Sequence, residues 1–218
     1  MTEGPNSIVL YVDDLWISPY VFSAFVALRE KGMPFQTRDV ALHKGDQKRP
    51  EYLDRTLTGR VPALQHGDFV LAESSAIAEY LEDVFAPPKY PRLFPQDLKL
   101  RARARQIMAW IRSDLMAIRD ERPTTTMFYQ PADQPLSAKG EEARDKLLHV
   151  ANGLIHEGET SLFGEYSIAD SDLAFMLQRL IINGHDVPVK VRNFAHAQWQ
   201  RPGAQEYINR KRPPNNPY

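Results

Sequence analysis

The segment from Thr58 to Glu82, TGRVPALQHGDFVLAESSAIAEYLE, limits the possible fold most, because it fits two strands, a turn and a helix into one short run. The residues from Val61 to Leu64 are typical of an apolar strand, His66-Gly67-Asp68 of a tight turn, and Phe69 to Leu71 of the antiparallel return strand. Pro62 lacks the N–H that a central ladder needs, so it predicts an edge, a bulge or a cis peptide bond at this point.

A helix is predicted to begin directly after these strands, at Glu73-Ser74-Ser75. Its apolar residues recur at helical spacing, at Ile77, Tyr80, Leu81 and Val84. A serine in this position is usually an N-cap, but no glutamate or glutamine stands where a capping box would need it. The whole segment therefore predicts two antiparallel strands followed by a helix.

The part of the chain before Thr58 predicts a strand, a helix and a second strand. The first strand spans Ile8 to Val12, and Ser18-Pro19 begins the helix, with serine as N-cap and proline at the first helical position. The second strand spans Phe35 to Leu42, and a right-handed crossover would make the two strands parallel. A short irregular helix is predicted within 43–57.

Residues 1–85 therefore predict a βαβ unit followed by a ββα unit, which is a mixed four-stranded sheet with helices on its faces. This order is the thioredoxin-like topology. Residues 86–96, APPKYPRLFPQ, hold four of the 17 prolines and predict a linker. Residues 97–218 predict an all-α helical-bundle domain.

The helices expected in that second domain are read from apolar periodicity. One long helix is predicted from Leu100 to Ile118, a second around Leu147 to Leu154, and a third from Leu173 to Ile181, with a last short helix from Pro202. Ser167-Ile168-Ala169-Asp170 predicts a capping box at the start of the third helix, with a structural role.

Several classes of protein are excluded or disfavoured by composition. A net charge of -1 gives no support for a nucleic-acid partner, and no apolar run is long enough to predict a membrane span. The opening MTEGPNSI lacks the pattern of a signal peptide, which together with the absence of cysteine fits the cytoplasm. The six histidines form no close ligand pair, so we expect no metal site.

Ser18 is the first candidate for chemistry, although an N-cap role would explain it equally well. A hydroxyl at a helix start can also donate a hydrogen bond to an anion, and a thiolate is the natural one. Lowering a thiol pKa from roughly 8.5 to below 7 takes about 3 kcal/mol. A hydrogen bond to a charged group supplies about 1.5–3 kcal/mol and a helix dipole about 0.3–1 kcal/mol. One serine could therefore do most of this work.

Glu73 and Ser74 form the second candidate. A pocket for a free amino-acid end needs an acceptor for the ammonium group and donors for the carboxylate. Glu73 supplies the acceptor, and Ser74 with the amides of the helix start supplies the donors.

With Ser18-Pro19, Arg60-Val61-Pro62, Glu73-Ser74 and the YSIADSDLA run in this order, the chain resembles the cytosolic glutathione S-transferase family, from Ile8 to about Arg212. Runs such as SPYVFSAFVALREKG look like the bacterial YfcF-type glutathione transferases in particular. The resemblance implies a first domain that binds glutathione, a helical second domain that shapes the electrophile pocket, and a homodimer.

The resemblance also implies roles for the site residues. Ser18 matches the serine that stabilises the glutathione thiolate, and Tyr11 is the alternative because other classes use a tyrosine near the first strand. Val61 matches the residue whose backbone pairs with the cysteinyl part of glutathione, and Pro62 matches the cis-proline after it. Glu73 with Ser74 matches the pair that holds the γ-glutamyl end.

Less well aligned positions complete the expected site. Lys48 or Lys44 is a candidate for the glycyl carboxylate. Plausible walls of the electrophile pocket are Trp16, Trp110, Arg112 and Arg119. Ser171 stands after the capping box, where a hydrophobic staple with Tyr166 would want an apolar side chain.

The function these residues and the resemblance imply is a glutathione S-transferase that conjugates glutathione to an electrophile or uses it to reduce peroxides. Two alternatives stay open. One is a non-catalytic member that uses the fold as a protein-binding module, and the other is a glutathione-dependent isomerase or dehalogenase.

Overall fold

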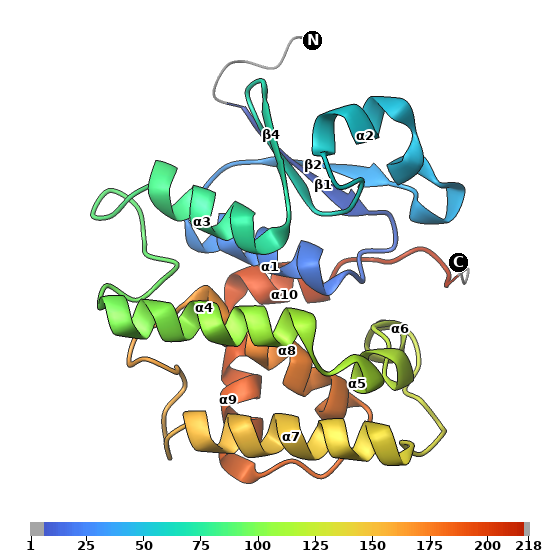
Figure 1. The fold of residues 1–218 in the computed structure, drawn as a ribbon, viewed down its shortest axis with the longest axis vertical. Coiled ribbons are helices and arrows are strands. Elements are labelled where there is room, and N and C mark those ends of the chain that lie inside the picture. Colours follow the sequence, from blue (N-terminus) through green and yellow to red (C-terminus); the bar gives the residue numbers. More distant parts are fainter. Residues whose placement is uncertain (1–6, 216–218) are drawn as a thin grey trace. The chain divides into compact units, whose positions relative to one another are not determined.

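A computed structural model describes residues 7–215, which form two compact units (Figure 1). The first unit runs to Leu93 and also takes in the residues from Asn209 onward, and the second runs from Phe94 to Ile208. The first six residues, which carry most of the argument against a signal peptide, lie outside the described residues. Across 7–215, no helix combines the length and the apolar character needed to cross a bilayer.

The first unit contains a four-stranded mixed sheet with strand order β2-β1-β3-β4. β1 (Ile8–Asp13) pairs in parallel with β2 (Gln36–Val40), and antiparallel with β3 (Ala63–His66). β3 pairs antiparallel with β4 (Phe69–Ala72). The predicted thioredoxin-like βαβ-ββα topology is confirmed.

Helices cover both faces of this sheet (Figure 1). α1 (Pro19–Glu30) and α3 (Ser74–Val84) pack against each other on one face. On the other face lies α2 (Pro50–Thr56), which follows two 3-10 turns at Leu42–Lys44 and Asp46–Lys48. The apolar layer under α2 is made by Val9, Tyr11, Val40, Ala63 and Ala72, with Tyr52 packed against it.

The strand predicted from Val61 begins two residues later, at Ala63. The Val61–Pro62 peptide bond is cis, and Pro62 has no N–H to donate, so the ladder starts only after it. The predicted turn is also shorter, because His66 pairs with Phe69 and leaves Gly67 and Asp68 as the turn.

The expectation that a serine caps α3 is wrong. The N-cap is Glu73, whose φ of 71° lies in the left-handed region and whose side chain makes no capping hydrogen bond. Ser74 is the first residue of the helix and is buried. A non-glycine residue at such a φ is strained, and strained residues of this kind cluster at functional sites.

A buried ion pair joins the ends of α1 and α3. The Nζ atom of Lys31 lies 2.6 Å from Oε2 of Glu82 and donates to the carbonyl of Phe85 at 2.9 Å. The same carboxylate oxygen accepts from the backbone N–H of Leu93 at 2.8 Å. The pair therefore fixes the chain where it leaves α3.

The segment predicted as a linker is well anchored. Leu93 of the first unit and Phe94 of the second are both buried, and the Pro87–Pro88 peptide bond is cis. The boundary between the units lies between Leu93 and Phe94, and the residues from Asn209 belong to the first unit instead of the helical one. The functional domain limits 1–85 and 97–218 stay a prediction.

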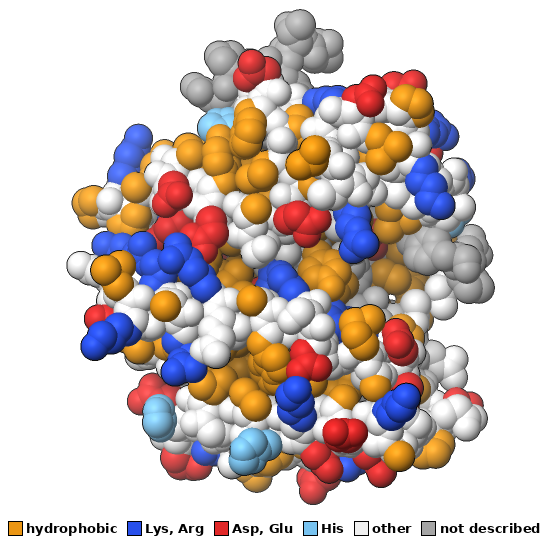
Figure 2. All heavy atoms as spheres, viewed as in Figure 1, with side chains coloured by type: hydrophobic (Ala, Val, Ile, Leu, Met, Phe, Trp, Pro, Cys, Tyr) orange, Lys and Arg blue, Asp and Glu red, His pale blue; other side chains and the backbone are white. Residues whose placement is uncertain are grey.

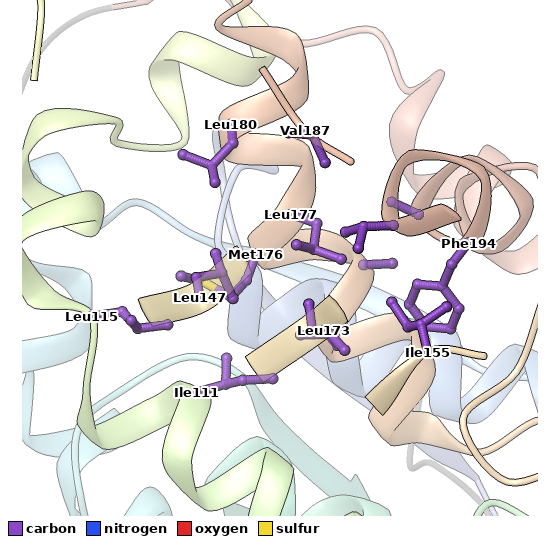
Figure 3. Packing of buried hydrophobic residues seen from close by; sticks show 14 of the residues in the cluster. Ile111, Leu115, Leu147, Ile155, Leu173, Met176, Leu177, Leu180, Val187 and Phe194 are labelled. Carbon is purple, nitrogen blue, oxygen red and sulfur yellow. The ribbon is translucent and has the colours of Figure 1, made fainter. Parts of the chain in front are cut away.

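The second unit is helical. Its elements are α4 (Leu98–Ser113), α5 (Met116–Glu121), α6 (Thr125–Phe128), α7 (Ala138–Leu154), α8 (Ile168–Ile182), α9 (Val189–Trp199) and α10 (Pro202–Ile208). Figure 3 shows its core, in which Leu173, Met176 and Leu177 of α8 lie among Ile111, Leu147 and neighbouring apolar side chains.

The prediction of one long helix from Leu100 to Ile118 is wrong, because the helix breaks after Ser113. Leu115 has a φ of 62°, and the Asp114 side chain accepts from its N–H at 2.7 Å. The same carboxylate accepts from Trp110 Nε1 at 3.0 Å. An aspartate that bonds locally to the backbone competes with helix continuation. Both helices still bury their apolar residues in one core. The apolar spacing therefore continues across the break, and it predicted one helix instead of two.

α9 was not predicted, although its sequence carries the signal. Val191, Phe194, Ala195 and Gln198 are buried at helical spacing, and Pro188 precedes the helix. The polar residues between them obscured the stripe. α6 is a single turn, too short to leave a periodic pattern.

The predicted capping box at α8 is confirmed. Asp170 accepts from the backbone N–H of Ser167 at 2.7 Å, and its other oxygen accepts from the N–H of Leu162 at 2.6 Å. Burial raises the pKa of Asp170 to about 6. At the staple position, Ser171 and the Tyr166 hydroxyl lie 3.0 Å apart, so a hydrogen bond replaces the expected apolar contact.

Replacing Asp170 by asparagine is expected to lower the free energy of unfolding by about 1–3 kcal/mol, because the new amide N–H₂ would face buried donors on Ser167. Ser167→Ala should cost about 1 kcal/mol, as the loss of a cap does. Urea denaturation followed by circular dichroism measures both. Asp145→Asn on the exposed face of α7 is the matched control, and an equal loss in that variant would contradict a specific role for the box.

Candidate functional site

The loops that follow β1 and β4 and the segment that precedes β3 leave the sheet at the same end. Tyr11 of β1 is paired with Ala63 of β3, and Ala63 is paired with Ala72 of β4. The chain therefore enters β3 through Val61-Pro62 at the end where β4 leads into Glu73. This register brings three of the predicted site elements to the same end of the strands.

An open groove of about 520 Å³ lies at this end of the strands, within the first unit. It brings together three residues predicted for the site, namely Ser18, Lys48 and Val61. The full lining is Ser18, Tyr20, Leu42, Gln47, Lys48, Leu53, Thr58, Gly59, Arg60 and Val61.

Ser18 is the N-cap of α1, as predicted. Its Oγ atom accepts from the backbone N–H of Val21 at 3.3 Å, and Pro19 occupies the first helical position. An oxygen that accepts a hydrogen bond still carries its own proton, so the hydroxyl has the capacity to donate to an anion as well. The helix start adds a favourable dipole for negative charge at this point.

A buried aspartate holds the loop that carries Ser18. Asp13 is 1% exposed, and its carboxylate accepts from the backbone N–H groups of Ile17 at 2.7 Å and Ser18 at 3.2 Å. Burial raises the pKa of Asp13 to about 6, partly offset by these two hydrogen bonds. Asp13 was not predicted as a site residue, because no local motif separates it from other loop aspartates.

The groove wall around Val61 depends on a glycine. Gly59 has a φ of 61°, and a Cβ atom there would lie 2.4 Å from Cδ2 of Leu53 and 3.1 Å from the carbonyl oxygen of Gln47. Another residue would have to displace the Leu53 side chain and adopt a left-handed backbone, so glycine is favoured here. The turn thus presents the Val61 backbone beside the groove, directly before the cis bond to Pro62.

Two cations line the groove. Lys48 was predicted, whereas Arg60 was quoted only as part of the Arg60-Val61-Pro62 run. The hydroxyl of Tyr52 donates to the carbonyl of Arg60 at 2.8 Å and so fixes its backbone. Burial raises the pKa of Tyr52, so that hydroxyl stays protonated. Lys44, the other candidate, does not appear in the lining.

Glu73 and Ser74 lie across the β3–β4 ladder from Pro62, since Ala63 and Ala72 are paired. The Glu73 side chain is exposed and Ser74 is buried at the helix start. Neither contributes to the lining of the groove itself. The two residues therefore form a second site, here called the corner, at the same end of the strands and beside the groove lining.

Tyr11, the alternative to Ser18, lies on the α2 face of the sheet. Its hydroxyl donates to Oε1 of Gln65 at 2.9 Å and accepts from Arg38 at 3.3 Å and Arg55 at 3.4 Å. It is not among the residues that line the groove. Of these two alternatives, only Ser18 lines the groove.

Trp16 was predicted as a wall of the electrophile pocket, and it is 4% exposed. Its indole Nε1 donates to Asp39 at 3.2 Å and its ring meets Phe25 edge-on. Arg210 stacks on the ring, with Cζ 3.5 Å from the ring centroid. The side chain is therefore covered within the first unit.

The other three predicted walls lie in the helical unit and have different surroundings. Trp110 lines a hollow of about 210 Å³ between α4 and α7, where Figure 2 shows apolar side chains at the surface. Arg112 forms an ion pair with Asp172 of α8 at 2.8 Å. Arg119 donates back to the carbonyls of Ile111 and Asp114. Among the pockets described within either unit, none collects all three.

Within 7–215, no three histidine, aspartate or glutamate side chains gather in a way that could hold a metal ion. The basic residues Arg101, Arg103 and Arg105 of α4 are exposed or partly exposed.

Comparison with known proteins gives matches over most of the chain. A family model described as "Glutathione S-transferase, N-terminal domain" matches residues 17–84, and one described as "Glutathione S-transferase, C-terminal domain" matches residues 97–211. Glutathione S-transferase 1 of Dianthus caryophyllus is 35% identical over 156 residues, which cover 68% of this chain and 67% of that protein.

Two further proteins are similar. Glutathione S-transferase theta-3 of Mus musculus is 31% identical over 154 residues, which cover 68% of this chain but less than two thirds, 63%, of the mouse protein. A crystal structure of a glutathione transferase homologue from Burkholderia, with bound glutathione, superposes with a TM-score of 0.79 at 42% identity, over 93% of this chain and 97% of that one.

Proposed function

The chain belongs to the glutathione S-transferase family, and from this premise we propose that its first unit binds glutathione and activates the thiol for attack on a small electrophile. The observation that supports this best is that three features lie at the same end of the strands. These are the helix start at Ser18, the cis bond after Val61, and the strained entry to α3 at Glu73.

In this proposal each part of glutathione contacts different residues at this end of the strands. Ser18 donates to the sulfur and holds it as a thiolate. The backbone of Val61, held before the cis-proline Pro62, pairs with the cysteinyl unit. Lys48 binds the glycyl carboxylate, and Arg60, which lines the same groove, is a second cation for it.

The γ-glutamyl end is assigned to the corner made by Glu73 and Ser74. The Glu73 carboxylate accepts from the ammonium group, and the Ser74 hydroxyl with the α3 amides donates to the α-carboxylate. Glu73 has a φ of 71° and directly precedes the first amides of α3, so both groups belong to the same turn of the chain.

The chemical step in conjugation forms a bond between sulfur and an electrophilic carbon while the leaving group departs with its electron pair. Reduction of a peroxide by two glutathione molecules, giving an alcohol, water and glutathione disulfide, uses the same thiolate and is the second activity proposed. The walls of the electrophile pocket remain a proposal that rests on the resemblance, as do the homodimer and a closer relation to the YfcF-type enzymes.

Calorimetry with glutathione, followed by turnover assays with an activated aryl halide and with an organic hydroperoxide, tests the function. We expect binding and turnover with at least one of the two substrates. Binding without any turnover would favour the non-catalytic, protein-binding alternative. Turnover only in an isomerisation or dehalogenation assay would favour the second alternative, a glutathione-dependent isomerase or dehalogenase.

Replacing Glu73 by glutamine is expected to raise the KM for glutathione roughly 10- to 100-fold, because a hydrogen bond to a charged group contributes about 1.5–3 kcal/mol. Turnover at saturating glutathione should change by no more than about twofold, since the lost contact is made equally in ground and transition states. Steady-state kinetics measure both. Glu142→Gln, on the exposed face of α7, is the control, and a normal KM in Glu73→Gln would contradict the γ-glutamyl assignment.

A further inference from the structure

The loop between β1 and α1 carries Ser18 and is held by hydrogen bonds from several directions. Asp13 binds its last two amides from inside, as described above, and Trp16 donates its own N–H to the Asp13 carbonyl at 3.0 Å. From β2, Asp39 accepts from the Trp16 indole. Trp16 itself has a φ of 55°, which a residue of this bulk adopts only where its surroundings hold it.

The remaining contact comes from the far end of the chain. Arg212 donates from Nε to the backbone carbonyl of Trp16 at 3.0 Å, across a sequence separation of 196 residues. The same guanidinium donates to the carbonyl of Arg210 at 3.0 Å. Arg210 in turn stacks on the Trp16 ring. The two arginines thus hold one peptide unit and one ring of the loop, and the segment that carries them belongs to the first unit.

A loop held in this way determines where the Ser18 hydroxyl lies. The carbonyl that Arg212 binds belongs to the Trp16–Ile17 peptide, so it is separated from Ser18 only by Ile17. Releasing that peptide would let the Trp16 backbone leave its left-handed conformation and would alter the direction of the two amides that Asp13 binds. Proximity and orientation are sensitive to such changes, since a displacement of about 1 Å can lower a rate by about a hundredfold.

We propose that Arg212, supported by Arg210, is a positioning residue for the glutathione thiolate site, acting through the Trp16 backbone to hold Ser18 in place. This inference rests on the proposed function, because it concerns the same thiolate. Neither residue is proposed to touch glutathione.

The test compares the unaltered protein with Arg212→Gln and Arg210→Gln in two independent measurements. The first is the pH titration of the thiolate absorbance of bound glutathione together with kcat. The second is hydrogen exchange of a peptide that contains Ile17 and Ser18, whose amides bind Asp13. Arg192→Gln is a matched control, because Arg192 also donates to a backbone carbonyl, that of Val187 in the helical unit. Circular dichroism verifies that each variant is folded.

We expect Arg212→Gln to speed exchange at 17–18 and, in the same variant, to raise the thiol pKa and lower kcat by about 10-fold. Arg210→Gln should show smaller changes in the same directions, and Arg192→Gln none. Faster exchange with an unaltered thiol pKa would overturn the inference, as would a raised pKa with unaltered exchange, which would point to a direct electrostatic effect of the guanidinium.

The failure of the two proposals can be told apart. If the unaltered protein gives no thiolate signal with glutathione, the proposed function fails and this inference fails with it. If the unaltered protein gives the signal and Arg212→Gln gives the same thiol pKa and kcat, only the role of Arg212 is overturned. If Arg212→Gln is unfolded by circular dichroism, Arg212→Met takes its place, because methionine has a long side chain and no donor. Normal exchange, thiol pKa and kcat in a folded Arg212→Met would equally overturn the inference.

Discussion

Replacing Ser18 by alanine is expected to raise the pKa of bound glutathione toward that of a free thiol, roughly 8.5, and to lower kcat at pH 6.5 by roughly 10- to 100-fold. The reason is the loss of one hydrogen bond to a charged sulfur, which contributes about 1.5–3 kcal/mol. Glutathione affinity should change less, because Val61, Glu73 and the cations of the groove are untouched. The titration of thiolate absorbance between pH 5 and pH 9 measures the effect directly.

Ser18 is also a helix cap, so the loss of stability must be separated from the loss of thiolate. Ser137→Ala is the control, because Ser137 caps α7 through the same type of bond, accepting from the N–H of Gly140 at 3.2 Å, although its hydroxyl also donates to Glu121. Both variants should lose about 1 kcal/mol of stability, and only Ser18→Ala should alter the thiol pKa. Ser18→Thr should retain most activity.

An unaltered thiolate titration in Ser18→Ala would contradict the serine assignment. Tyr11→Phe then becomes the informative variant. In the present structure the Tyr11 hydroxyl bonds to Gln65, Arg38 and Arg55. We therefore expect Tyr11→Phe to lower stability and leave the thiol pKa unaltered.

Replacing Lys31 by methionine is expected to destabilise the protein by about 3–5 kcal/mol, the largest effect on stability that we predict. Lys31 is 1% exposed, and its ammonium group is the partner of the buried Glu82 carboxylate at 2.6 Å. Removing one member of such a pair leaves an uncompensated buried charge. Within the described residues, Oε1 of Glu82 has no hydrogen-bond partner, so without Lys31 the carboxylate would keep only the backbone N–H of Leu93 as a donor.

The double replacement Lys31→Met with Glu82→Leu should recover most of that loss, because two apolar side chains of similar volume can replace a buried ion pair at little cost. Urea denaturation of the two single variants and the double variant forms a double-mutant cycle. A loss in Lys31→Met of less than about 1 kcal/mol would contradict the importance of the pair. A double variant no more stable than the single ones would show that the backbone contacts to Phe85 and Leu93 matter more than the charges.

Local patterns were sufficient for much of the fold and of the candidate site. Ser18-Pro19 marks a helix start by cap and proline chemistry that acts within one turn, and Ser167 to Asp170 forms its box within four residues. The proline within an apolar run left an edge, a bulge or a cis bond open at Val61-Pro62, and the family resemblance pointed to the cis bond that the structure has. These features depend on neighbours in sequence, so they can be recognised before any tertiary contact is known.

Other features followed competing local chemistry that periodicity does not register. The break at Asp114 arises because its carboxylate binds the Leu115 amide and the Trp110 indole. The N-cap of α3 is Glu73 and not a serine, because the chain turns sharply from β4 into the helix and does so at a left-handed φ. At both places the buried apolar residues were predicted correctly, but the residue at which the helix begins or ends was not.

Local patterns in the chain predicted the thioredoxin-like order of elements and the helical second half, since caps, proline geometry and periodic burial act over a few residues. They also singled out Ser18, Pro62, Glu73 and Ser74 as candidates, whereas Val61 came from the family resemblance. The surroundings of these residues depend on tertiary contacts. Strand register placed Pro62 across from Glu73, and the chain returned to bring Arg212 to the Trp16 carbonyl, 196 residues away. Such contacts depend on burial and on chain closure over long separations, and no short pattern records them.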